Sequence, residues 1–154
     1  MQSSSRYWIA LALSSAAATG CTDLGVGDPC IPETIPCSAD GKSCGYEATE
    51  AYVEASSVQC RSRLCLVYKL DNGTAGAVPS DPRDLCTGKS NDKEGCVTPT
   101  ALNDSIYCTC RCEGAQRAED NCSCPDGFTC EQVLTLGGPG IVGSYCVKSS
   151  TVNK

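Results

Sequence analysis

The sequence predicts a small disulfide-rich domain, mainly β-strand and loop with little helix, held together by up to seven disulfides. Three observations predict this fold class. The 154-residue chain contains fifteen cysteines, far above ordinary usage. Core-forming residues are scarce, since less than a fifth of residues 21–154 are Leu, Ile, Val or Phe. The apolar runs are short and lie between turns rich in Pro, Gly and Asn.

Residues 1–20 have the features of an export signal. They contain no acidic residue and one basic residue, Arg6, ahead of an apolar stretch over residues 7–18. This stretch is shorter than the roughly twenty residues that a helix needs to cross a bilayer, and small residues follow it. We therefore expect residues 1–20 to be a signal peptide that directs the chain to an oxidising compartment, where disulfides form.

The odd number of cysteines means that at least one of them cannot pair within the chain. Cys21 stands apart, directly after the expected signal peptide. If Cys21 is the exception, the remaining fourteen can form seven bridges, although their connectivity is not fixed by the sequence. The expected disulfide cysteines are Cys30, Cys37, Cys44, Cys60, Cys65, Cys86, Cys96, Cys108, Cys110, Cys112, Cys122, Cys124, Cys130 and Cys146.

The sequence ATGC at residues 18–21 resembles the lipobox of bacterial lipoproteins. In that family a small residue precedes a cysteine that receives a diacylglyceryl thioether and becomes the new N-terminus. Thr19 and Gly20 fit the pattern, whereas Ala18 stands where the family usually has Leu. The resemblance implies lipidation of Cys21, and Thr22, which is not Asp, implies an outer-membrane address facing the periplasm or the surface. The whole chain resembles the cysteine-rich lipoproteins of Gram-negative bacteria, a resemblance that brings no biochemical activity.

A second cleavage site competes with the lipobox. Residues 16–18 are all alanine and match the A-x-A pattern of the ordinary signal peptidase, which would leave Cys21 as a free thiol. An unpaired thiol in an oxidising compartment favours bridging between molecules. Lipidation is therefore the preferred interpretation of Cys21.

The mature chain divides into a tether and a stapled domain. Residues 21–29 are polar, contain two glycines and a proline, and are expected to form a flexible tether. Residues 30–154 form the disulfide-stapled domain, in which the residues from Cys30 to Cys44 predict a coil with little regular structure. A surface loop is expected at 70–84, and a division of the domain into two halves near 71–84 is one option.

Several segments of the domain predict strands. Residues 64–70 are rich in Leu, Val and Tyr and predict a strand, while 45–56 fit a helix or a strand equally well. Residues 105–114 alternate, with three cysteines on one face of an expected strand; these sulfurs must bond to other segments, because cysteines two apart are poor partners. A last strand is expected within 143–150.

The sequence CSCPDGFTC at residues 122–130 contains a Pro-Asp-Gly turn between cysteines. It resembles the end of an epidermal-growth-factor-like module over nine residues. One residue between Phe128 and Cys130 is fewer than that family's last spacing requires. We interpret the segment as a convergent turn between bridges, from which no calcium-binding or receptor-binding residue carries over.

The composition argues against most catalytic chemistry. The chain has no histidine, which removes Ser-His and Cys-His dyads and the commonest general base. Carboxylates can still serve a glycosidase-like hydrolase, and the candidates are Glu47, Glu50, Glu54, Asp120 and Asp126. We expect these to be exposed surface acids, with no catalytic residue in the chain.

Metal and nucleic-acid binding are also disfavoured. The C-x-C pairs at 108–112 and 122–124 suit soft metals, but paired C-x2-C units and histidines are missing, so we expect disulfides, no metal and no cofactor. The net charge of −6 disfavours nucleic acid, and Arg61, Arg63 and Arg111 are expected to be scattered rather than to form a basic spot.

The sequence therefore predicts an exported, lipid-anchored protein of the outer membrane or cell surface. Its expected role is non-catalytic: binding of an unknown protein or glycan partner, or a structural function. Three alternatives stay open, namely a secreted inhibitor or adhesion-type module without lipid, a thiolate metal-binding protein and a carboxylate-based hydrolase. Exposed aromatic residues clustered on one face would favour a binding role.

Overall fold

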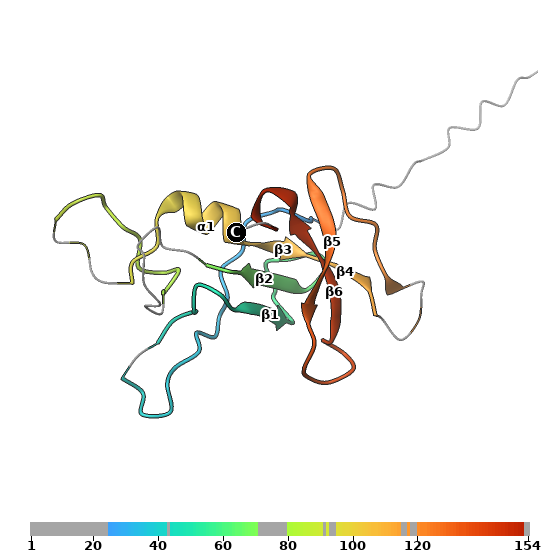
Figure 1. Ribbon diagram of the computed structural model, residues 1–154, viewed down its shortest axis with the longest axis horizontal. Coiled ribbons are helices and arrows are strands. Elements are labelled where there is room, and N and C mark those ends of the chain that lie inside the picture. The colour runs from blue at the N-terminus through green and yellow to red at the C-terminus, as the bar shows by residue number, and fades with distance from the viewer. Residues whose placement is uncertain are drawn as a thin grey trace, which may run out of the picture.

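The computed structural model of the protein describes residues 25–42, 44–70, 80–90, 92, 95–114, 117 and 120–152. Within these residues it contains two three-stranded antiparallel sheets and one short α-helix (Figure 1). The predicted fold class, mainly strand and loop with little helix, is confirmed. Residues 1–24, including Cys21, and most of the expected 70–84 loop lie outside the described residues.

The first sheet has the order β1-β2-β3. Its strands are β1 (Ala51–Ala55), β2 (Leu64–Tyr68) and β3 (Ile106–Thr109). The strand predicted within 64–70 is thus confirmed as β2. The ambiguous segment 45–56 forms a strand over its second half, because Tyr52 and Val53 find cores on opposite faces of the sheet.

The second sheet has the order β4-β6-β5. It consists of β4 (Arg111–Glu113), β5 (Phe128–Leu134) and β6 (Gly143–Lys148), and β5 and β6 run across one end of the first sheet in Figure 1. The last strand predicted within 143–150 is confirmed as β6.

The single strand expected over 105–114 is corrected, because the structure divides it at Cys110. Thr109 ends β3 in the first sheet and Arg111 begins β4 in the second. The Cys110 carbonyl accepts the Cys146 N–H at 3.1 Å, and the Cys110 sulfur bonds to Cys122. At this residue the chain therefore stops pairing with β2 and begins to pair with β6. As predicted, the three alternating cysteines bond to other segments rather than to one another.

The helix α1 (Pro99–Ser105) was not predicted. Its local signal is the Thr98-Pro99 pair: the Thr98 hydroxyl accepts the Ala101 N–H at 3.1 Å as an N-cap, and proline suits the first helical position, where its missing N–H has no partner to lose. The helix leads directly into β3 at Ile106.

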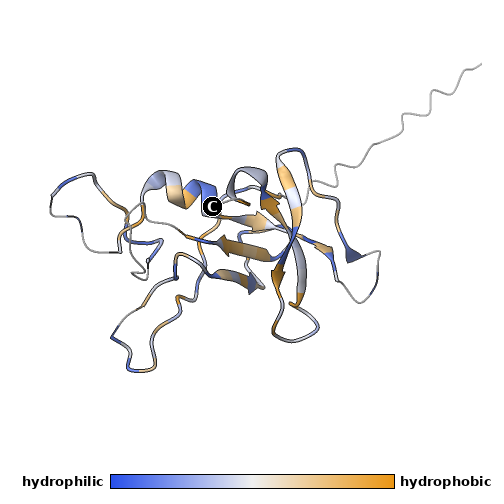
Figure 2. Cartoon of the chain, in the orientation of Figure 1, coloured by the Kyte–Doolittle hydropathy of each residue, from blue (hydrophilic) through white to orange (hydrophobic). Residues whose placement is uncertain are grey.

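The first sheet is covered on both of its faces. One face packs against loops that the N-terminal bridges hold, and the other packs against β6; Figure 2 shows β2, which contributes to both, as strongly apolar. The loop-side core contains Cys30, Tyr46, Cys60, Cys65, Val67, Leu70, Val97, Ile106 and Cys108. The inter-sheet core contains Val53, Leu66, Tyr68, Tyr107, Tyr145 and Val147.

Seven disulfides confirm the predicted set of fourteen paired cysteines. They are Cys30–Cys65, Cys37–Cys44, Cys60–Cys108, Cys86–Cys96, Cys110–Cys122, Cys112–Cys130 and Cys124–Cys146. None of the seven joins a residue before Thr109 to a residue after it. The Cys60–Cys108 bridge and the β2–β3 pairing both join residues before 71 to residues after 84. The bridges therefore form two separate sets, one on each side of Thr109.

The Pro-Asp-Gly turn predicted after Cys124 is present. The Phe128 N–H donates to the Pro125 carbonyl at 3.1 Å, and Gly127 adopts a φ of +84°, which favours glycine at this position of the turn. The turn places Cys124 and Cys130 in bridges to β6 and β4, respectively. It has the structural role that the sequence assigns to it.

The Asp92 carboxylate organises the loop that the Cys86–Cys96 bridge closes. It accepts the Thr87 hydroxyl at 2.5 Å, the Thr87 N–H at 2.9 Å and the Gly88 N–H at 2.8 Å. These hydrogen bonds, the Thr87 side chain first among them, lower the pKa of Asp92 below its usual value.

Acid is expected to open this loop. Because the pKa of Asp92 is lower in the folded than in the unfolded chain, its stabilisation is present above about pH 4 and is lost as the pH falls through the folded pKa. NMR should show the amide signals of Thr87 and Gly88 moving together below about pH 4. Asp92→Asn should abolish that movement, and its persistence in the variant would contradict the assignment.

Candidate functional site

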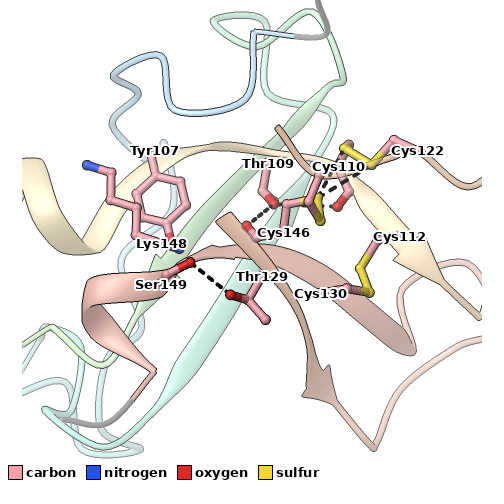
Figure 3. The surroundings of a disulfide bond; sticks show 11 residues. Tyr107, Thr109, Cys110, Cys112, Cys122, Thr129, Cys130, Cys146, Lys148 and Ser149 are labelled. Carbon is pink, nitrogen blue, oxygen red and sulfur yellow. Dashed lines mark hydrogen bonds between the residues drawn. A yellow bond between two sulfur atoms is a disulfide. The ribbon is translucent and has the colours of Figure 1, made fainter. Parts of the chain in front are cut away.

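The predicted disulfide cysteines form a structural framework in which the sulfurs are crowded. The sulfurs of Cys110 and Cys122 each lie 3.7 Å from that of Cys146, and Figure 3 shows these bridges beside Thr109, whose hydroxyl donates to the Cys146 carbonyl at 2.7 Å. Sulfurs from neighbouring bridges also meet elsewhere, for example at Cys30, Cys60 and Cys108. Each of these sulfurs is already bonded to another, so the oxidised protein offers no thiolate from these groups to a metal.

The structure distinguishes one of the five predicted carboxylate candidates from the other four. Of the five, Glu54 lines a surface groove with a volume of about 260 Å³. Glu47, Glu50, Asp120 and Asp126 do not line it. The other residues of the groove, which sequence reasoning did not single out, are Glu33, Thr34, Tyr52, Val53, Ala55 and Ser56.

The groove lies along β1, which is an edge strand. Within the described part of the chain, β1 pairs with β2 on one side and with no strand on the other. The opposite edge of the same sheet is closed, because Gly27 donates its N–H to the Cys108 carbonyl and Cys108 donates to the Asp28 carbonyl, both at 2.8 Å. The first sheet therefore has one covered edge and one open edge.

Two hydrogen bonds at the ends of the β1–β2 ladder fix its phase. The Lys69 N–H donates to the Glu50 carbonyl at 2.8 Å, and the Ser56 N–H donates to the Arg63 carbonyl at 2.8 Å. Directly hydrogen-bonded pairs alternate with non-bonded pairs in an antiparallel ladder. Residues 52 and 54 are thus the ones that bond to β2.

The residues between them present their backbone to the open edge. By the same alternation, the N–H and C=O groups of Ala51, Val53 and Ala55 point away from β2. Val53 is nonetheless anchored, because the residue as a whole is only 8% exposed and its side chain packs in the inter-sheet core. Among the described residues, these outward donors and acceptors have no strand to pair with.

A tyrosine pair and one hydrogen bond hold the facing wall of the groove. The buried Tyr46 hydroxyl donates to the Thr34 carbonyl at 2.8 Å, and its ring lies 5.3 Å from that of Tyr52. Burial raises the pKa of Tyr46, so the hydroxyl remains a donor at neutral pH. The Glu33 N–H donates to Glu54 Oε1 at 2.9 Å and joins the wall to β1.

Only one of the two carboxylate oxygens of Glu54 has a hydrogen-bond partner among the described residues. Its second carboxylate oxygen, Oε2, is buried and has no hydrogen-bond partner among the described residues. A buried polar oxygen without a hydrogen bond lacks the contact that normally offsets its burial. A cationic group bound in the groove would lie near this carboxylate and stabilise its charge.

Arg111, one of the three arginines considered as a basic spot, packs against its neighbours. The Arg111 guanidinium lies over the Tyr145 ring, 5.9 Å from its centroid, and donates to the Gly140 carbonyl. Arg61 and Arg63 are exposed and lie in the connection between β1 and β2. Arg111 is thus engaged within its own sheet.

The aromatic residues of the described chain build the core rather than a surface cluster. Tyr46, Tyr107 and Tyr145 are fully buried, and the large hydrophobic residues that are exposed are aliphatic: Ile31, Val58, Leu85 and Leu136. The exposed aromatic face that would favour binding is therefore not found there. Among the described residues, no helix has the length and apolar character to span a membrane.

No protein family, curated protein or solved structure matches this chain. The groove and its edge strand thus have to be interpreted from their own chemistry.

Proposed function

We propose that this is an exported protein, anchored at the outer membrane through lipid on Cys21, whose stapled domain has a non-catalytic binding role. The observation that carries the proposal is the cysteine balance. The seven bridges use fourteen of the fifteen cysteines, and the fifteenth, Cys21, is the one that follows the lipobox-like sequence at 18–20.

The form of the domain supports a binding role. Disulfides fix the loops on one side of the first sheet, so a partner would meet a surface that loses little conformational freedom on binding. The groove of about 260 Å³ is smaller than the roughly 300–1,000 Å³ of typical small-molecule sites. Its open edge favours a macromolecular partner over a small substrate.

Cell fractionation of the full chain tests the anchor. The protein purified from the membrane fraction is expected to begin at Cys21, to carry added acyl mass, and to expose fourteen further thiols to alkylation only after reduction. Cys21→Ser should move the protein to the soluble fraction, because lipid provides the expected attachment. Thr22→Ser is the matched control and should remain with the membrane.

The alternatives give different results. An unmodified chain that begins at Thr19 would overturn the lipid anchor and favour the secreted module without lipid. Many thiols that react without reductant would favour the thiolate metal-binding alternative. Hydrolysis of a glycoside that is lost in both Glu33→Gln and Glu54→Gln would favour the hydrolase.

A further inference from the structure

We propose that the open edge of β1 binds an extended peptide segment carrying basic side chains, by adding it as a fourth strand to the first sheet. This inference deepens the proposed function, since it rests on a binding role for the domain and names the class of partner. It concerns a protein segment, recognised through its backbone and its charge.

The backbone of β1 supplies the first part of the recognition. Ala51, Val53 and Ala55 present outward N–H and C=O groups along a strand of five residues, a length of roughly 17 Å. Strand addition to an exposed sheet edge gives affinity through main-chain hydrogen bonds and specificity through alternate side chains. The covered edge at Gly27 and Asp28 leaves β1 as the side of this sheet that can accept a strand.

The facing wall supplies the second part. Glu33 and Thr34 stand opposite β1 across the groove, and Tyr46 and Glu54 hold them there. An added strand has alternate side chains on this side of the sheet, so one of them would enter the groove. The groove volume of about 260 Å³ suits a single long side chain better than a whole ligand.

The charge of the groove selects the side chain. The exposed Glu33 and the partly buried Glu54 both line it, and Glu47 and Glu50 precede β1 in the chain. Glu54 Oε2 is buried and has no partner among the described residues, so a lysine or arginine of the added strand would stabilise its charge by lying near it in the groove rather than by a direct contact. The same acidic edge disfavours a second copy of this chain as occupant, because edge-to-edge pairing would bring like charges together.

Peptide titration of the oxidised full chain tests the inference. The probe is a seven-residue peptide that alternates lysine with valine, compared with the same peptide carrying glutamate in place of lysine. The lysine peptide is expected to bind, and to shift the NMR amide signals of Ala51, Val53 and Ala55 more than those of β2. The glutamate peptide should not bind.

Two variants separate the charge from the backbone contribution. Glu54→Gln keeps an acceptor for the Glu33 N–H but removes the charge, and should weaken binding about tenfold or more. Ala55→Pro removes an outward N–H without breaking a bond to β2, and should also weaken binding. Asp126→Asn, which removes one charge from an exposed turn outside the groove, is the matched control and should bind as the unaltered chain does.

Several outcomes would overturn the inference. Equal binding of the two peptides, no binding of either, or signal shifts confined to β5 would each reject it. Concentration-dependent dimerisation that Ala55→Pro abolishes would assign the edge to a second copy instead. If the peptide does not bind but Cys21 is acylated, the strand-addition inference is wrong and the lipid anchor is retained. If the peptide binds but Cys21 carries no lipid, only the lipid anchor is wrong.

Discussion

Replacing Cys60 and Cys108 together by alanine is expected to lower the free energy of unfolding by about 4 kcal/mol. This bridge spans 48 residues, the longest separation of the seven, so its loss frees the unfolded chain most in the chain-entropy model. Both cysteines are also buried in the loop-side core, where alanine leaves space. Urea unfolding of the oxidised protein, followed by circular dichroism, measures the change.

The Cys37–Cys44 bridge is the matched control. It spans seven residues, and both of its cysteines are exposed, so the double alanine variant should lose only about 2.5 kcal/mol. Losses of equal size for the two pairs would contradict the assignment of the longer bridge as the main constraint on the N-terminal part of the domain.

Tyr107→Ala is expected to destabilise the protein by about 3–5 kcal/mol. Tyr107 is fully buried between the sheets, its ring packs edge-on against Phe128 at 5.6 Å, and its hydroxyl accepts the Lys148 N–H at 2.9 Å. Since none of the seven bridges crosses Thr109, contacts of this kind hold the two sheets together. Hydrogen exchange should therefore increase in β6 as well as in β3.

Tyr107→Phe separates the hydroxyl from the ring. It keeps the packing and leaves the Lys148 N–H without its acceptor, so the expected loss is about 1–3 kcal/mol. Unaltered hydrogen exchange in β6 of the alanine variant would show that the sheets are held together by other means.

Local sequence signals predicted the elements of this fold better than their partners. The strand signals at 64–70 and 143–150 become β2 and β6, because β2 contributes side chains to both cores and β6 contributes Tyr145 and Val147 to the inter-sheet core. The 105–114 alternation correctly separates the cysteines but conceals the break at Cys110, which depends on its pairing with Cys146 far along the chain. The disulfide connectivity depends on the same long-range contacts, which residue spacing does not encode.

The groove was beyond prediction for a related reason. Glu54 could be named as one acidic residue among several, but its place beside Glu33 follows from how a coil of the N-terminal part packs along β1. Whether a strand has an open edge depends on the order of strands in its sheet. The local composition of 51–55 carries no information on that order.

The bridges also limit how far the oxidised domain can be stretched. From Cys30 to Cys146, a covalent path runs through four bridges and the brief stretches 60–65, 108–110 and 122–124. Pulled taut with its sulfurs oxidised, this path reaches only about 50 Å, whereas the same stretch of unbridged chain would extend to about 400 Å. Force applied between Cys30 and Cys146 can therefore separate the strands of both sheets, but it cannot extend the oxidised domain beyond the length of this path.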